Sequence, residues 1–275
     1  MRKIIRFLAT NPVTWPLFKI MHRFTNRFVF ERELIGIEQR QLKHQKQEEA
    51  LKKKFENLYV QNGLFKGMEY PSFTAMGSSI YSKLVGSYES ELFPIMERVL
   101  RTPYEIIIDV GCAEGYYAVG LALKMPSAKV YAYDINPMAL QQCKKMAMIN
   151  NVESRMVFEE RCSPNTLQNF DFSKRSLIVC DCEGYELELF NEENLPNLKK
   201  CDILIELHDL YNEEISYRLH QLFSKTHHLE YIYSENTFKR FEKLDLLNAF
   251  SLSEIKNFFT ERNGIMQWVF ITPLA

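Results

Sequence analysis

Short apolar runs alternate with stretches of helical apolar spacing from residue 105 to the C-terminus. The strand-like runs cover residues 105–110, 129–133, 155–159, 176–181, 201–207, 229–233 and 265–272. The helix-like stretches between them cover residues 116–124, 137–150, 185–193 and 211–224. Alternation of this kind is typical of a mainly parallel sheet covered by helices on both faces. The pattern therefore predicts an α/β, Rossmann-like, doubly wound domain.

The first thirty residues combine an apolar helical stripe with positive charge. Residues 1–30 contain six lysines and arginines and no acid. The stripe consists of Leu17, Met21, Phe24 and Phe28. A basic amphipathic helix can lie on an anionic membrane as a peripheral contact. The same stripe can equally pack on the protein's own core or on a second subunit, so both expectations stay open.

A long charged helix is expected from about Ile37 to residue 60. Leu51, Phe55 and Leu58 recur at helical spacing on this otherwise polar segment. They either dock on the main domain or form one end of a homodimeric coiled coil through residues 51–58. Polar residues occupy the middle of the coiled-coil seam, which favours docking.

Composition narrows the class of protein. The formal net charge of −1 gives no overall sign of a nucleic-acid binder, so we expect no nucleic-acid partner. Six cysteines without a CxxC pair indicate reduced thiols in a cytoplasmic protein. No apolar run approaches the roughly 20 residues of a membrane span, so any membrane attachment is expected to be peripheral.

The strand-like run that ends near Asp109 leads into a glycine turn and then into a helix. In a parallel sheet, ligands bind beyond the carboxyl ends of the strands, where this turn lies. Glycine there allows the backbone to approach a ligand closely. The candidate cofactor contacts in this turn are Asp109, Gly111, Cys112, Ala113, Gly115 and Tyr116.

The second strand-like run is followed by Asp134, about twenty residues beyond the turn. A carboxylate at this position can accept hydrogen bonds from both hydroxyls of a ribose. Ile135 and Asn136 beside it, and Arg161 and Cys162 after the third strand-like run, are further candidate cofactor contacts. The turn and the acid together predict a cofactor that contains a nucleoside.

A dinucleotide does not fit this pattern. The fingerprint G-x-G-x-x-G would need glycine where Ala113 and Tyr116 stand, and Tyr116 would crowd a pyrophosphate. S-adenosyl-L-methionine (SAM) has no phosphate, and the ammonium group of its amino-acid end suits a nearby acid such as Asp109. The residues therefore predict a SAM-dependent methyltransferase, against the alternative of a glycine turn that binds no ligand.

Three signatures occur together in this part of the chain. They are Asp109-Val110-Gly111 with Gly115-Tyr116-Tyr117 and then Asp134 with Asn136-Pro137; Asp181-Cys182-Glu183-Gly184-Tyr185-Glu186; and Glu206 inside the fifth strand-like run. Over residues 105–210 they resemble the signatures of the FkbM-type SAM-dependent methyltransferases. The sequence departs from that family where Ala113 replaces asparagine and where Asp134 replaces the longer glutamate.

The resemblance implies a methyltransferase strand order with an antiparallel last strand, so that residues 105–275 form the SAM-binding domain. It also implies O-methylation of a small-molecule or glycan acceptor, often a sugar or a related hydroxyl-bearing metabolite. N-methylation of an amine is the alternative among enzymes. A catalytically silent binding or assembly protein that uses its N-terminal helices is the alternative outside them.

A hydroxyl acceptor needs a base to take its proton. Asp181 and Glu183 follow the fourth strand-like run, and His208 and Asp209 follow the fifth. Histidine has an ordinary pKa of about 6.5, so we expect His208 to be the base, supported by Asp181 or Glu183. The alternatives are that these residues only cap a helix or satisfy the core, or that Asp181 and Asp209 hold a cation such as Mg²⁺.

The region before the sheet is expected to cover the cofactor. A glycine turn at Gly86 is followed by Tyr88 and acids, which indicates either a lid or an ordinary capped helix. Tyr88 is therefore a further candidate cofactor contact. The expected organisation is a basic and charged helical extension over 1–60, a connecting or lid region over 61–104, and the sheet domain.

Overall fold

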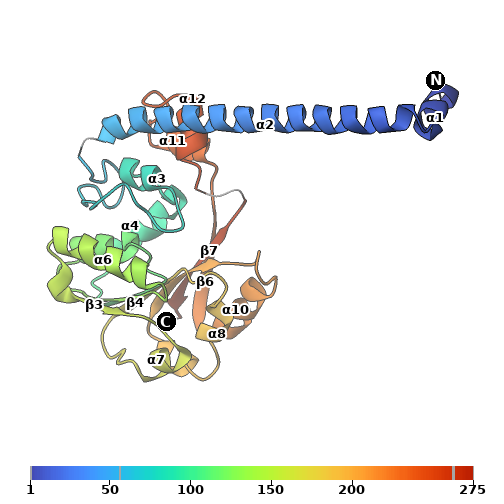
Figure 1. Ribbon diagram of the computed structural model, residues 1–275. Coiled ribbons are helices and arrows are strands. Elements are labelled where there is room, and N and C mark those ends of the chain that lie inside the picture. The colour runs from blue at the N-terminus through green and yellow to red at the C-terminus, as the bar shows by residue number, and fades with distance from the viewer. Residues whose placement is uncertain (1, 56, 262–263, 275) are drawn as a thin grey trace. The chain divides into compact units, whose positions relative to one another are not determined.

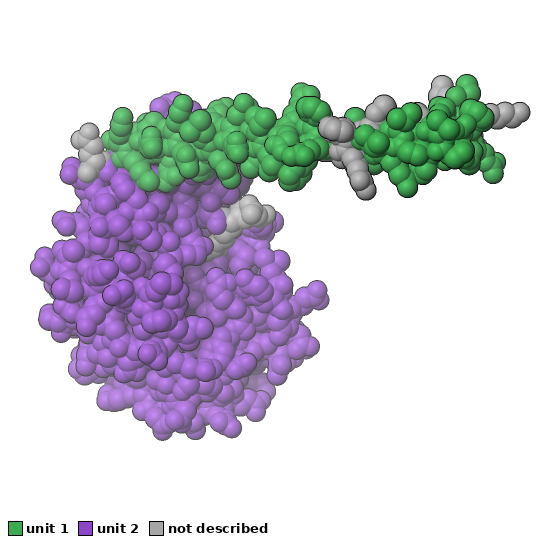
Figure 2. Space-filling model, in the orientation of Figure 1, with its two compact units in different colours: residues 1–54 green, residues 55–275 purple. Residues whose placement is uncertain are grey.

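The computed structural model describes residues 2–55, 57–261 and 264–274. It separates into two compact units, Met1–Lys54 and Phe55–Ala275, which Figure 2 shows in green and purple. The second unit contains the sheet and every candidate site residue.

The first unit consists of two helices, Arg2–Thr10 (α1) and Thr14–Lys52 (α2). The helix expected from about Ile37 thus begins much earlier. Pro16 lies in the first turn of α2, where its missing N–H removes no helical hydrogen bond.

The apolar side chains of this unit are largely exposed. Leu17 is 60% exposed and Phe28 is 73% exposed, whereas the side chains of Met21 and Phe24 lie outside the described residues. None of the helices in the described part of the chain is long and apolar enough to cross a membrane. The membrane contact of residues 1–30 stays a prediction.

The second unit is built on a seven-stranded sheet, visible in Figure 1. Its strands are Ile106–Val110 (β1), Lys129–Tyr133 (β2), Met156–Glu159 (β3), Ser176–Cys180 (β4), Asp202–Leu207 (β5), His227–Tyr233 (β6) and Gln267–Pro273 (β7). They are arranged in the order β3-β2-β1-β4-β5-β7-β6, and β7 is antiparallel to both of its neighbours. The mainly parallel Rossmann-like sheet with an antiparallel last strand is confirmed.

Helices connect and cover these strands. The α-helices are Ile80–Val85 (α3), Phe93–Arg101 (α4), Tyr116–Lys124 (α5), Pro137–Ile149 (α6), Pro164–Asn169 (α7), Glu186–Leu189 (α8), Leu195–Leu198 (α9), Ile215–Phe223 (α10), Thr237–Lys243 (α11) and Leu252–Phe258 (α12). Short 3-10 helices occupy Lys53–Phe55 (η1), Ser90–Leu92 (η2) and Glu153–Arg155 (η3). The helix expected over 185–193 stops at Leu189 because Phe190 is extended and Asn191 then forms a turn with Asn194.

The register of the parallel strands positions the site. Val110 at the end of β1 pairs with Tyr133 of β2 and with Cys180 of β4. The residues that follow these three strand ends therefore meet at one edge of the sheet. β1 and β4 lie in the middle of the sheet and are buried along their whole length, as their unbroken apolar runs suggest.

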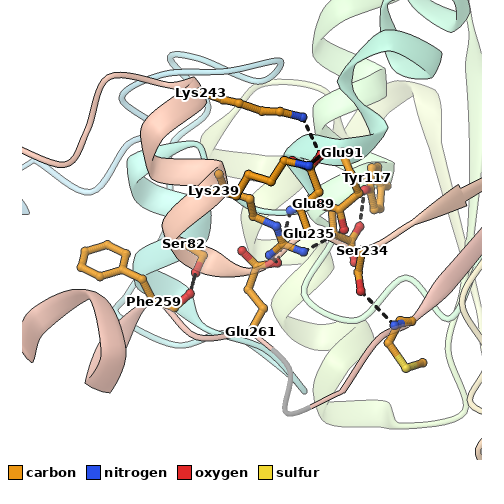
Figure 3. A network of polar contacts seen from close by, with 12 residues as sticks. Ser82, Glu89, Glu91, Tyr117, Ser234, Glu235, Lys239, Lys243, Phe259 and Glu261 are labelled. Carbon is orange, nitrogen blue, oxygen red and sulfur yellow. Dashed lines mark hydrogen bonds and ion pairs between the residues drawn. The ribbon is translucent and has the colours of Figure 1, made fainter. Parts of the chain in front are cut away.

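Two segments that are distant in sequence form an aromatic cluster above this edge. One precedes the sheet, and the other, residues 234–266, connects β6 to β7. Phe55 stacks on Phe250 with ring centroids 6.3 Å apart, and Phe241 meets Phe259 at 4.9 Å. Ser82 donates a hydrogen bond of 2.9 Å to the carbonyl of Phe259, as Figure 3 shows. These contacts hold the segment before the sheet against the connection between β6 and β7.

The apolar residues expected as a buried stripe at the end of the charged helix differ in exposure. Leu51 and Phe55 are buried, and Leu58 is partly buried. Whether residues 51–58 also mediate a homodimer stays a prediction.

Candidate active site

A cavity of about 890 Å³ opens at the carboxyl ends of β1, β2, β4 and β5. Its floor is the glycine turn after β1, and its walls come from the loops after the other strands. Residues from the segment before the sheet and from the connection between β6 and β7 complete the wall. A volume of this size is in the range of cofactor and substrate sites, and the location matches the ligand crevice of open parallel sheets.

The glycine turn is held in a conformation that only small residues tolerate. Gly111 has a φ of +83°, and a Cβ atom there would lie 1.7 Å from the carbonyl oxygen of Asp181. Ala113 also has a positive φ of 50°. Gly111 is therefore required by the close approach of the loop after β4, as well as by space for a ligand.

Asp134 ties the turn to the next strand. One carboxylate oxygen accepts the N–H of Ala113 at 2.8 Å, and the other accepts the N–H of Asn136 at 2.8 Å. Asn136 in turn caps α6 through the N–H of Met138 at 3.0 Å. Each carboxylate oxygen has two lone pairs, so Asp134 can still accept hydrogen bonds from ribose hydroxyls.

Asp109 is a buried acid in the cavity wall. Asp109 is only 2% exposed to solvent, and one of its carboxylate oxygens has no hydrogen-bond partner among the described residues. Burial, followed by the negative charge of Asp181, raises the pKa of Asp109 to about 8. A cationic ligand group would supply the missing partner and favour the charged form.

The other predicted cofactor residues mostly line the same cavity. Cys112, Ala113, Tyr116, Ile135, Asn136, Arg161, Cys162 and Tyr88 all do so, together with Asp109, Gly111 and Asp134. Gly115 does not line the cavity; a Cβ there would lie 2.8 Å from the sulfur of Cys143, so this glycine serves the packing of α5 on α6. The exposed guanidinium of Arg161 lies 5.2 Å from the ring centre of Tyr185.

His208 is the centre of the opposite wall. Its Nδ1 lies 2.6 Å from a carboxylate oxygen of the buried Glu186. Its Nε2 faces three further acids, with Asp181 at 3.4 Å, Glu183 at 3.5 Å and Glu206 at 3.8 Å. The structure thus brings together His208, Asp181 and Glu183, the three residues predicted for catalysis.

The environment of His208 acts on its pKa in two directions. Burial lowers the pKa, whereas the hydrogen bond to Glu186 and the charges of Asp181, Glu186 and Glu183 raise it, and the acids prevail. Glu186 also selects the tautomer, because a carboxylate acceptor keeps a proton on Nδ1. A neutral ring in this tautomer would carry its lone pair on Nε2, the nitrogen beside Asp181 and Glu183.

Asp209, the alternative partner of Asp181 for a cation, is not among the residues that line the cavity. Asp209 instead accepts the backbone N–H of Ser216 at 2.9 Å and the hydroxyl of the same residue, which fixes the start of α10. Asp181, Glu206 and His208 do have ligand atoms within 4.8 Å of one another, a spacing compatible with a divalent cation. The same spacing suits a protonated histidine among carboxylates, so it does not require a metal.

A buried ion pair connects the region predicted as a lid, residues 61–104, to the glycine turn. Lys83 in α3 pairs with Glu114 in the turn, and its ammonium lies 4.7 Å from the ring centre of Tyr88. Glu114 also accepts the N–H of Met76 at 2.9 Å. Sequence reasoning did not single out Lys83 or Glu114, because neither carries a local motif.

A second buried network joins the same region to the connection between β6 and β7 (Figure 3). Arg240 of α11 pairs with Glu91 at 2.7 Å and also with Glu261. The Tyr117 hydroxyl at the start of α5 donates to Glu89. Of the three acids in this network, Glu261 lines the cavity. It is a site residue that the sequence analysis missed.

Residues 102–221 match the family model described as "Methyltransferase domain". This segment carries β1 to β5, the glycine turn, Asp134 and His208. This segment is therefore similar to methyltransferase domains, and SAM is the cofactor that the similarity supports. The buried oxygen of Asp109 and the open lone pairs of Asp134 fit the ammonium group and the ribose of that cofactor.

Two curated relatives match parts of the chain. The release factor glutamine methyltransferase of Flavobacterium psychrophilum is 32% identical over 87 residues, which cover 32% of this chain and 29% of that protein. The ribosomal protein L11 methyltransferase of Acinetobacter baylyi is 44% identical over 52 residues, 19% of this chain and 17% of that protein. The chain therefore spans less than a third of the length of either relative.

Solved structures of methyltransferases are similar in parts. The O-methyltransferase TomG from Streptomyces achromogenes, in complex with SAM, has a TM-score of 0.45 and 8% identity, covering 66% of this chain and 78% of that chain. An rRNA methylase from Streptococcus thermophilus has a TM-score of 0.48 and 14% identity, covering 68% of this chain and 99% of that chain.

The expectation of no nucleic-acid partner is wrong. The two curated proteins that match parts of this chain are named for a release factor and for a ribosomal protein. The expectation was based on the net charge of the whole chain, which does not determine which acceptor fits the cavity. A near-neutral charge therefore does not exclude a macromolecular acceptor.

Proposed function

We propose that this protein transfers a methyl group from SAM to a hydroxyl group of its acceptor, with His208 as the base. The observation that carries the proposal is the place of His208 across the cavity from Asp134. Its Nδ1 lies 2.6 Å from Glu186, and its Nε2 lies beside Asp181 and Glu183, which line the cavity with it. A histidine oriented by a carboxylate is an arrangement suited to accepting a proton from a hydroxyl.

The residues have separate tasks in this reaction. When bound, SAM supplies a methyl group that its sulfonium has already activated. The enzyme therefore chiefly needs to align the acceptor oxygen and remove its proton. His208 Nε2 would take the hydroxyl proton while the acceptor oxygen takes the methyl group, whose bond to the sulfonium sulfur would break to leave S-adenosylhomocysteine. Glu186 stabilises the imidazolium that results, and Asp181 and Glu183 can accept hydrogen bonds from the acceptor.

The resemblance to the FkbM-type family supports a hydroxyl acceptor. The residues Asp181, Glu183, Glu186 and Glu206, which carry two of its signatures, all surround His208. The two curated relatives support a different acceptor, since their names specify glutamine and ribosomal protein substrates. A nitrogen acceptor is therefore the competing outcome of the test.

The test has two stages. Isothermal titration should first show that the protein binds SAM. Methyl-labelled SAM is then offered with a panel of sugars and with matched amines, and base-stable ether products are separated from methylamines. Transfer to hydroxyls supports the proposal, whereas transfer to amines alone would replace it with N-methylation. A folded protein that binds SAM but methylates neither panel would overturn the proposal of a hydroxyl acceptor of this kind.

A further inference from the structure

The connection between β6 and β7 places one acid in the wall of the cofactor cavity. We propose that Glu261, from this connection, holds the ammonium group of the methionyl end of bound SAM. The inference rests on the proposed use of SAM but not on the identity of the acceptor. It assigns a binding role to a residue of this connection, which lies outside the methyltransferase domain match at 102–221.

The first argument is the state of the Glu261 carboxylate. Its side chain is only 1% exposed. One oxygen accepts the guanidinium of Arg240 and the N–H of Glu89 at 3.3 Å. The other oxygen is buried and has no hydrogen-bond partner among the described residues. Leaving such an oxygen unmatched costs free energy, so its presence at a cavity wall indicates a donor that arrives with the ligand.

The second argument is the position of Glu261 along the cofactor. If Asp134 holds the ribose, the methionyl end of SAM would occupy the rest of the cavity, which the glycine turn and the start of α5 line through Tyr116 and Tyr117. Glu261 belongs to that end, because Glu89 links it to the hydroxyl of Tyr117 in the first turn of α5. Figure 3 shows Glu89 and Tyr117 on the same side of this network.

The third argument is charge. Burial raises the pKa of Glu261 to about 7, although the guanidinium of Arg240 opposes this shift. The carboxylate therefore gains most from a further positive charge in its neighbourhood. The ammonium group of SAM is a cation with three donors, which matches a single open carboxylate oxygen. Asp109 lies in the same cavity wall and can share this group.

The experiment compares three ligands that differ at the methionyl end. Isothermal titration measures the binding of SAM, S-adenosylhomocysteine and methylthioadenosine, which lacks the amino-acid group. Glu261→Gln should weaken binding of the first two roughly ten- to a hundredfold and leave methylthioadenosine unchanged. Glu261→Asp keeps the charge and should retain more of the affinity than Glu261→Gln.

Glu91→Gln is the matched control, because Glu91 also pairs with Arg240 but does not line the cavity. It should leave all three affinities nearly unchanged, with melting temperatures measured in parallel. Equal losses for all three ligands in Glu261→Gln would overturn the inference, since they indicate a structural role. Unchanged affinities, or a change only in the KM of the acceptor, would overturn it too. A wild-type protein that binds no SAM would instead refute the proposed function itself.

Discussion

The two sides of the cavity are built from different material. On the cofactor side, the backbone of one continuous turn supplies the surface, and Asp134 fixes that turn through the N–H groups of Ala113 and Asn136. On the acceptor side, side chains from separate loops converge on His208. The first arrangement is local in sequence, whereas the second exists only after the sheet has formed.

This difference separates what each side can tolerate. The turn depends on glycine and on positive φ values, so its failures are steric. The acceptor side depends on a buried histidine among acids, so its failures are electrostatic. Substitutions in the glycine turn or at Asp134 should therefore change the affinity for SAM. Substitutions around His208 should change the turnover.

The largest expected effect is on turnover at the acceptor side. His208→Ala should lower turnover about 10²–10⁴-fold, because it removes the proton acceptor. SAM affinity should hardly change, since Asp134 and the glycine turn are untouched. His208→Gln, which is closer in volume, guards against a loss that arises from packing alone. Single-turnover kinetics and isothermal titration measure the two quantities separately.

His220→Ala is the matched control, because His220 is exposed and does not line the cavity. It should leave both quantities unchanged. If His208→Ala kept near-full turnover, positioning alone or another base would carry the step. If it weakened SAM binding as strongly as turnover, the division between the two sides of the cavity would be wrong.

The contrast between local and convergent sites also explains what could be predicted from the sequence. The glycine turn and Asp134 are continuous motifs next to strands, so the sequence could place them together, and in the structure they line one cavity. Asp209 was misplaced because sequence position gives only the strand end, not the direction of the side chain, which turns toward α10. Glu261 and Lys83 were missed because their partners lie in distant segments.

A second prediction concerns stability at the point where both sides meet. The pKa of Asp109 is about 8 in the folded protein, against an ordinary value of 3.8. The folded state therefore binds more protons between these pH values, and its stability falls as the pH rises. Asp109→Asn removes this pH-dependent loss. The free energy of unfolding of the variant, compared with that of the wild type, should therefore be more favourable at pH 8 than at pH 5 by on the order of a few kcal/mol.

Chemical denaturation at both pH values measures this difference. The groups that act on the Asp109 carboxyl are Asp181 and Asp134, which raise its pKa, and Lys83 and the Ala118 N–H, which lower it. The control is Asp171→Asn, an exposed acid whose pKa is lowered, so it should show no such gain at pH 8. Equal stabilities of wild type and Asp109→Asn at both pH values would show that Asp109 is ionised without penalty.

The smallest of the three effects is expected at Asp134, on the cofactor side. A carboxylate that accepts ribose hydroxyls makes charge-assisted hydrogen bonds of about 1.5–3 kcal/mol, so Asp134→Ala should weaken SAM binding roughly ten- to a hundredfold. Part of that loss comes from the turn, because Ala113 and Asn136 lose their acceptor.

Binding of adenosine separates the two causes. Loss of a ribose contact should weaken the binding of adenosine and of SAM alike. A disordered turn should weaken chiefly the binding of SAM, whose methionyl end would contact the turn. An unchanged SAM affinity in a folded Asp134→Ala variant would mean that the ribose is held elsewhere. The side of the cavity built from backbone would then bind the cofactor without its acid.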